Sequence, residues 1–121
     1  MLELIRRRKV WLLQILTDPN HHILVGTIDE KIISSCVLVV VHNLTHQQRP
    51  YALIENVITD KSFRNFGYAT MLLEHAKSIA AENNCYKIML MTGSKEENIL
   101  NFYEKAGYNR NDKTAFIQWL E

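Results

Sequence analysis

A short stretch between an apolar run and a helix-patterned segment carries the residues best suited to bind an anion. It reads Arg64-Asn65-Phe66-Gly67-Tyr68-Ala69, and it lies between the strand-like run 51–59 and the amphipathic segment 71–81. A strand that passes through a short loop into a helix leaves the first backbone N–H groups of that helix unpaired, at the positive end of its dipole. Gly67 has no Cβ, so the backbone there can approach a ligand closely. The pattern predicts a pyrophosphate site.

Two further side chains are candidates for the proton transfers of acyl transfer to an amine. In that reaction the amine loses a proton, and the leaving thiolate benefits from gaining one. Tyr103 is the candidate acid, because the reference pKa of a phenol, about 10, lies close to that of a thiol, ~8.5. Glu55 is the candidate base, since it places a carboxylate in an otherwise apolar strand. The alternatives are a core aromatic residue at Tyr103 and a surface carboxylate at Glu55.

These residues belong to two motifs that together resemble the acetyl-CoA signature of the GNAT superfamily of N-acetyltransferases. The first is Arg64-x-x-Gly67-x-Ala69, and the second is Asn101-Phe102-Tyr103-Glu104-Lys105-Ala106-Gly107-Tyr108. The resemblance runs from about Leu24 to the C-terminus. It implies an α/β fold with a central mixed sheet flanked by helices, and a tyrosine, Tyr103, near the CoA sulfur.

The resemblance also implies which residues hold acetyl-CoA. Backbone groups of Val57, Ile58 and Thr59 would pair with the pantetheine arm, as an added strand does. The pyrophosphate would lie against Arg64, Asn65, Phe66, Gly67, Tyr68, Ala69 and Thr70. A solvated loop arginine is the alternative for Arg64. Asn98 is a further candidate for the pantetheine arm, although Glu96 occupies the place where the family usually has its asparagine.

The elements that must position these residues follow from periodicity and from cap and turn signals. We expect one domain over residues 1–121, with helices at 2–17, after Gly67 and after a capping box of Ser94 and Glu97. We expect strands at 22–28, 31–42, 51–59, 86–91 and 114–120. The first two strands would form a hairpin. Segment 51–91 would form a parallel pair joined by a right-handed crossover.

Family members usually begin with a further strand and helix, which this chain is expected to lack. The strand at 22–28 would then expose an edge that invites pairing with another chain. The helix at 2–17 would carry an apolar stripe that includes Trp11. We therefore expect a homodimer with the N-terminal region at or near the contact.

Composition narrows the possible partners. A length of 121 residues with 47% hydrophobic residues suffices for a core, and a net charge of +1 predicts no general binding to nucleic acid. The apolar run 10–16 is too short to span a membrane. Cys36 and Cys85 have neither disulfide nor metal-ligand spacing, and the histidines have no metal-ligand spacing, so we expect reduced thiols, a cytoplasmic location and no metal.

The expected function is therefore transfer of acetyl from acetyl-CoA to a primary amine of a small molecule. Direct attack within a ternary complex is expected, because neither motif contains a cysteine. The competing interpretation is a non-catalytic acyl-CoA-binding module with a regulatory or interaction role.

Overall fold

The computed structural model describes residues 15–121, which fall into a unit ending at Leu90 and a second unit, Met91–Glu121. Ile15–Thr17 are helical, and the rest of the helix predicted at 2–17 lies outside the described residues. The predicted dimer contact through the N-terminal region also falls largely on residues that are not described, so it stays a prediction.

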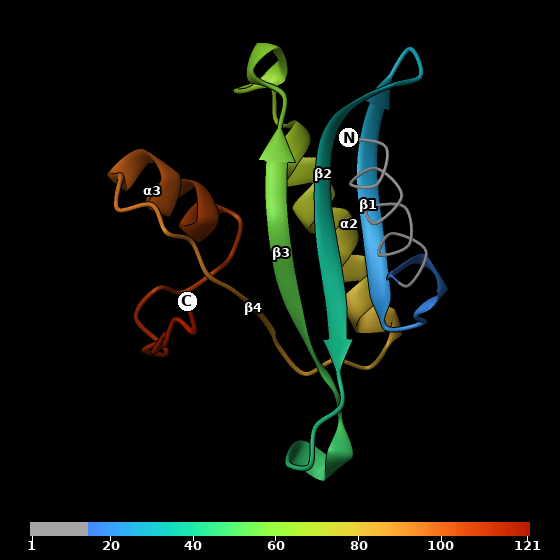
Figure 1. Cartoon of the computed structure of the whole chain (residues 1–121), viewed down its shortest axis with the longest axis vertical. Helices are drawn as coiled ribbons and strands as arrows, with labels where there is room; N and C mark the ends of the chain where they lie inside the picture. The colour runs from blue at the N-terminus through green and yellow to red at the C-terminus, as the bar shows by residue number, and fades with distance from the viewer. Residues whose placement is uncertain (1–14) are drawn as a thin grey trace. The chain divides into compact units, whose positions relative to one another are not determined.

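The first unit is built on a four-stranded mixed sheet (Figure 1). Its strands β1 (His21–Ile28), β2 (Lys31–Val41), β3 (Tyr51–Thr59) and β4 (Ile88–Leu90) are adjacent in chain order. The pairs β1–β2 and β2–β3 are antiparallel, and β3–β4 is parallel, which confirms the predicted hairpin and mixed sheet. Asp29 and Glu30 join β1 to β2 with φ values of 49° and 66°. Two consecutive left-handed residues are what a type I′ hairpin turn requires.

Helix α2 (Tyr68–Glu82) packs on one face of this sheet, behind the strands in Figure 1. Its apolar stripe includes Leu72, Leu73, Ala76 and Ala80, which are buried, whereas Ala69 is only partly buried. They share the core with alternate residues of the strands, which are Leu24, Cys36, Leu38, Val40, Ala52 and Ile54, together with Ile33. One face of β1, β2 and β3 therefore meets α2.

The second unit contains helix α3 (Glu97–Lys105). Gly107 follows it with φ 104°, in the left-handed region that commonly ends a helix. The predicted capping box is wrong. Ser94 Oγ accepts a hydrogen bond from the N–H of Glu96 (3.2 Å), and the N-cap is Glu96, which makes no side-chain cap bond. The Ser94 hydroxyl therefore bonds to a residue that precedes the first residue of α3, Glu97, and it does not cap the helix.

The strand predicted at 114–120 is also wrong, since these residues form no strand and Phe116 and Leu120 are each 93% exposed. The residue types favour a strand, but a strand also needs a partner for its backbone groups. None of the described strands pairs with this segment. The strand predicted at 86–91 is present but shorter, at Ile88–Leu90.

A β-bulge interrupts β3 just before the residues predicted to bind the cosubstrate. Val37 pairs with Glu55, but Ser35 pairs with Ile58. A step of three residues along β3 therefore lies opposite a step of two residues along β2. Asn56 lies inside this step with φ 55°, in the left-handed region that asparagine tolerates better than most residues. The bulge therefore depends on a residue that can adopt a left-handed backbone.

The left-handed backbone at position 56 predicts the effect of substitutions there. Asn56→Val should lower the free energy of unfolding by about 1–2 kcal/mol, because a β-branched residue is disfavoured at positive φ. Asn56→Gly, the matched control, should leave the stability close to wild type. Urea unfolding of both variants measures the difference, and equal stabilities would contradict the role of the bulge geometry.

Candidate functional site

Beyond the bulge, strand β3 has one edge that no strand of the first unit covers. The parallel ladder with β4 ends at the pair Ile54–Leu90. Before the bulge, the N–H of Ala52 donates to the carbonyl of Lys87 on the β4 side (3.0 Å). After it, the N–H of Asp60 donates to the carbonyl of Ile33 on β2 (2.7 Å). The N–H and C=O groups of successive residues point alternately to the two neighbouring strands. Because the bulge adds one residue, even-numbered residues of this segment face β4 before it and β2 after it.

It follows that Val57 and Thr59 direct their N–H and C=O groups away from β2, to the uncovered side. The contact of Arg64 agrees with this direction, since its Nε donates to the carbonyl of Thr59 (3.1 Å). The guanidinium makes no other hydrogen bond with the described residues, and Arg64 is exposed. An extended ligand with amide groups could pair with this edge as a further strand would.

The N-terminus of α2 lacks a side-chain cap among the described residues. Gly67 is the N-cap, with φ 84°, and the first turn contains no acidic residue. The first bond of the helix runs from the N–H of Met71 to the carbonyl of Gly67 (3.0 Å), so the N–H groups of Tyr68, Ala69 and Thr70 have no acceptor within the helix. A Cβ at Gly67 would meet no protein atom within 4 Å. The space before the helix is open, and its donors suit an anion.

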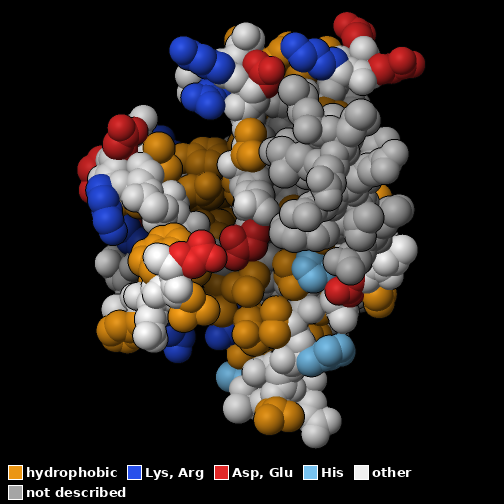
Figure 2. Space-filling model, viewed as in Figure 1, with side chains coloured by type: hydrophobic (Ala, Val, Ile, Leu, Met, Phe, Trp, Pro, Cys, Tyr) orange, Lys and Arg blue, Asp and Glu red, His pale blue; other side chains and the backbone are white. Residues whose placement is uncertain are grey.

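A loop of residues 60–67 joins the end of β3 to this helix N-terminus. Asp60 accepts a hydrogen bond from the N–H of Ser62 (2.9 Å) and caps the short 3₁₀ turn η2 (Lys61–Phe63). Asn65 continues the loop with φ 68°. Figure 2 shows Lys and Arg side chains interspersed with Asp and Glu side chains at this end of the first unit, where η2 and the β1–β2 turn lie in Figure 1. The charges around the helix end therefore include cations that attract an anion.

Glu55 lies one residue before the bulge, opposite Val37 on β2. Its neighbour Ile54 is buried beneath α2, so alternation directs the Glu55 side chain to the opposite face of the sheet. Glu55 is exposed, and no described residue forms an ion pair with it. The carboxylate is therefore accessible beside the open edge.

Tyr103 and Asn98 belong to the second unit, on α3, while all other candidate residues belong to the first. Tyr103 is half-buried, and its ring lies 5.1 Å from that of Phe102 in an edge-to-face arrangement. Asn98 is exposed in the first turn of the helix. The predictions for these two side chains stay predictions.

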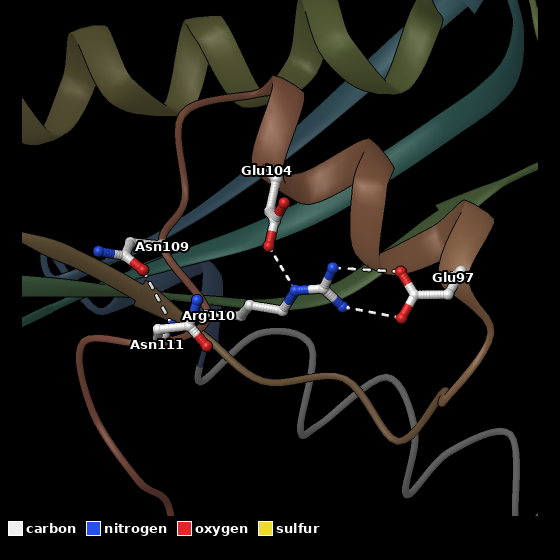
Figure 3. A network of polar contacts seen from close by, with 5 residues as sticks. All are labelled: Glu97, Glu104, Asn109, Arg110 and Asn111. Atoms are coloured by element: carbon white, nitrogen blue, oxygen red, sulfur yellow. Dashed lines mark hydrogen bonds and ion pairs between the residues drawn. The ribbon is translucent and has the colours of Figure 1, made fainter.

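A network of charged residues in the second unit was not predicted from the sequence (Figure 3). The Arg110 guanidinium donates to both carboxylate oxygens of Glu97 (3.2 and 3.1 Å), and its Nε contacts Glu104, a residue of the second motif. The hydrogen bonds from Arg110, and then its charge, hold the pKa of Glu97 below its ordinary value. Bonding to Glu97 in turn raises the pKa of Arg110. The network ties both ends of α3 to the chain that follows.

Residues 15–121 contain neither a group placed to hold a metal ion nor a membrane-spanning helix. No group of three His, Cys, Asp or Glu residues within 15–121 is placed to hold a metal ion. None of the helices in that range is long and apolar enough to cross a membrane.

Comparison with known proteins identifies the family. The sequence model described as the acetyltransferase (GNAT) family matches residues 3–108. The chain belongs to this family. A glucosamine 6-phosphate N-acetyltransferase of Trypanosoma brucei brucei is 30% identical over 83 residues, which cover 69% of this chain and 54% of that protein. The chain thus spans about half the length of this curated relative.

Solved structures of similar fold agree with this membership. A protein of Agrobacterium tumefaciens str. C58 named "Putative acetyltransferase" is 36% identical with a TM-score of 0.85, over 91% of this chain and 76% of that one. A transcriptional regulator of Bacillus halodurans C-125 is 26% identical with a TM-score of 0.83, over 98% and 77% of the two chains. The fold is the GNAT acyltransferase fold, as the sequence resemblance predicted.

The Arg110 network predicts a change in the titration of Glu97. Because the folded pKa of Glu97 is lowered, the contribution of this pair is present at neutral pH and is lost as the pH falls through that lowered pKa. Arg110→Gln should raise the pKa of Glu97 to that of an ordinary glutamate, as read by NMR titration of its side-chain carboxyl. Lys105→Gln also removes one positive charge, at the end of α3, but it keeps the hydrogen bonds between Arg110 and Glu97. It should therefore leave most of the lowering of the Glu97 pKa in place. An unchanged Glu97 titration in Arg110→Gln would contradict the network.

Proposed function

We propose that this protein is an acetyl-CoA-dependent N-acetyltransferase that acts on a primary amine of a small molecule. The observation that carries the proposal is the continuity, within the first unit, between the outward-facing backbone groups of β3 and the N–H groups that have no acceptor within α2. The outward groups of Val57 and Thr59 lead through one loop to the uncapped N-terminus of α2. In CoA, an extended chain with amide groups likewise leads to a pyrophosphate, so the amide chain would lie along β3 and the pyrophosphate at the N-terminus of α2.

The residues present fit acetyl-CoA on chemical grounds. Val57 and Thr59 would pair with the amides of the pantetheine arm, and Ile58 would hold the strand between them. The N–H groups of Tyr68, Ala69 and Thr70 would bind the pyrophosphate, with Asn65, Phe66 and Gly67 shaping the approach. Arg64 would add a positive charge beside it. Acetyl-CoA supplies the acetyl group as an activated thioester, and no metal is part of the proposal.

The chain's own residues would then handle protons. Glu55 would accept a proton from the acceptor amine, directly or through a water molecule, since its carboxylate is exposed beside the open edge of β3. Tyr103 would donate a proton to the leaving thiolate, and Asn98 would assist in holding the pantetheine arm. Burial raises the pKa of the Cys36 thiol and of the Cys85 thiol, which disfavours their reactive thiolates. This supports direct attack by the amine rather than an acyl-cysteine intermediate.

The acceptor is best sought among small amines. The name of the curated relative makes amino sugar phosphates the first compounds to test, followed by other metabolite amines. An assay with acetyl-CoA and a panel of such amines, read by release of free thiol, tests the proposal. Amine-dependent thiol release supports it, and CoA binding without release for any amine favours the second candidate.

That second candidate is a non-catalytic acyl-CoA-binding module with a regulatory or interaction role. It is favoured by the similarity to a protein named as a transcriptional regulator. It would use the same backbone groups of β3 and α2, but it would not need Tyr103 or Glu55. A homodimer and a cytoplasmic location complete the proposal, and light scattering tests the first of these against the chain mass of 14.1 kDa.

The cosubstrate site predicts a specific loss of CoA affinity on substitution of Gly67. Gly67→Asn tolerates the left-handed backbone and places a side chain in the open space before α2, so calorimetry should show CoA binding at least about tenfold weaker. Gly67→Val should weaken binding as well, but it also strains the backbone at φ 84°. Gly107→Asn is the matched control, because Gly107 is also left-handed, with open space around it, but lies in the second unit. A folded Gly67→Asn variant with wild-type affinity would refute the site.

The roles of Tyr103 and Glu55 predict losses of turnover rather than of binding. Tyr103→Phe should lower kcat by about 10²–10⁴-fold, the usual contribution of a positioned acid, while CoA affinity stays unchanged. Tyr86→Phe removes a hydroxyl elsewhere and serves as the control. Wild-type turnover in Tyr103→Phe would return this residue to the role of a packing aromatic.

Glu55→Gln should reduce kcat most at the lower end of the range of about pH 6–9, where the acceptor amine is largely protonated.

A further inference from the structure

Ser34 is a buried polar residue at the end of the sheet that carries the proposed site. Ser34 is 2% exposed, and no other polar or charged residue among those described is buried. It lies on β2 opposite Thr59, the last residue of β3. Its Oγ donates to the carbonyl of Ile58 (3.1 Å) and lies 3.0 Å from the Thr59 Oγ1. Both contacts join β2 to the part of β3 beyond the bulge.

The hydrogens of these groups can be assigned. A serine hydroxyl has one hydrogen, and the Ile58 carbonyl can only accept. Ser34 therefore donates to Ile58, and the Thr59 hydroxyl must donate to Ser34 Oγ. The result is a directed chain from Thr59 through Ser34 to Ile58. On its other side Thr59 is held by Arg64, whose Nε donates to the Thr59 carbonyl.

This end of β3 needs such support because it has few other contacts. Past Ile54 none of the described strands pairs with it on the β4 side, and the bulge at Asn56 interrupts its ladder with β2. The remaining registered pairs are Ser35–Ile58 and Ser34–Thr59, followed by the bond from Asp60 to Ile33. A short ladder at a strand end opens readily, since few bonds must break together.

We propose that Ser34 is a positioning residue for the cosubstrate, because its hydroxyl fixes Val57–Thr59 so that their outward backbone groups stay aligned for the pantetheine arm. This proposal rests on the proposed binding of acetyl-CoA. Ser34 itself touches neither cosubstrate nor acceptor; it acts through Ile58 and Thr59. Loss of its hydroxyl therefore affects acetyl-CoA binding and leaves the proton transfers unchanged.

A purely structural serine would give a different result, and the variants separate the two. Ser34→Ala removes both hydrogen bonds, whereas Ser34→Thr keeps the hydroxyl. A pocket of about 220 Å³ borders Ser34. Ser35→Ala, at the next residue of β2, is the matched control. Thr59→Val removes the other hydroxyl of the chain with little change of shape.

The experiment measures CoA affinity by calorimetry and acetyl-CoA KM and kcat with an accepted amine, well below each variant's Tm. Ser34→Ala should weaken CoA binding and raise KM by about tenfold, the scale of one or two lost hydrogen bonds. Its kcat at saturating acetyl-CoA should stay within about twofold of wild type. Ser34→Thr should restore the affinity, and Ser35→Ala should not change it. The double variant Ser34→Ala with Thr59→Val should lose less than the product of the two single losses, because both break one chain.

A Ser34→Ala variant with a lower Tm but wild-type CoA affinity and KM would overturn the role of Ser34 while leaving the proposed function intact. Additive losses in the double variant would do the same. Wild-type protein that binds no CoA would instead overturn the proposed function, and the role of Ser34 with it. If Ser34→Ala fails to fold, Thr59→Val carries the same test, and wild-type affinity in that variant would overturn the role.

Discussion

The candidate site depends on one extra residue in strand β3. Had β3 continued without a bulge, Val57 would direct its backbone groups to β2, and Ile58 would take the outer side. The left-handed Asn56 reverses this order. It also coincides with the end of the ladder with β4, so the strand has an uncovered edge whose groups belong to Val57 and Thr59. An uncovered edge is normally a liability, because it pairs with other chains. Here it is short, and Arg64 already bonds to one of its carbonyls.

The second half of the site rests on a helix end that the chain leaves without a side-chain cap. Relative to glycine, a Ser, Thr, Asp or Asn cap adds only about a few tenths of a kcal/mol to stability, and α2 begins with Gly67. A few residues earlier, Asp60 does cap the short turn η2. A capping side chain at position 67 would occupy backbone donors at this helix end. In the proposed site, the uncapped N-terminus leaves those donors available to an anion.

The sequence predicted the parts of the fold that follow from local patterns. The bounds of β3, the hairpin and the buried stripe of α2 follow from the alternation of apolar residues and from Gly67. The bulge could not be predicted, since Asn56 in a strand has no distinctive pattern around it. Ser34 also gave no signal, because a serine in a strand usually faces solvent. Its role became visible only through its contact with residues 24 and 25 positions later.

The two predictions that failed depended on competition between contacts. Ser94 was expected to cap α3, but its hydroxyl bonds to the nearer N–H of Glu96, and the carboxylate expected to complete the box, Glu97, binds Arg110. That ion pair joins residues 13 positions apart, which no local pattern reports. Segment 114–120 has strand-forming residues, but pairing is a property of two segments, and sequence preference describes only one of them.

The proposed function divides its tasks between the two units. The backbone donors and acceptors for acetyl-CoA all lie in the first unit, on β3 and α2, whereas Tyr103 lies in the second. A site made of backbone groups is sensitive to geometry more than to side-chain identity. Residues that set this geometry, such as Asn56, Ser34 and Gly67, should therefore govern affinity for the cosubstrate. In the proposed mechanism the side chains that exchange protons would govern the rate, so substitutions should alter binding and chemistry separately.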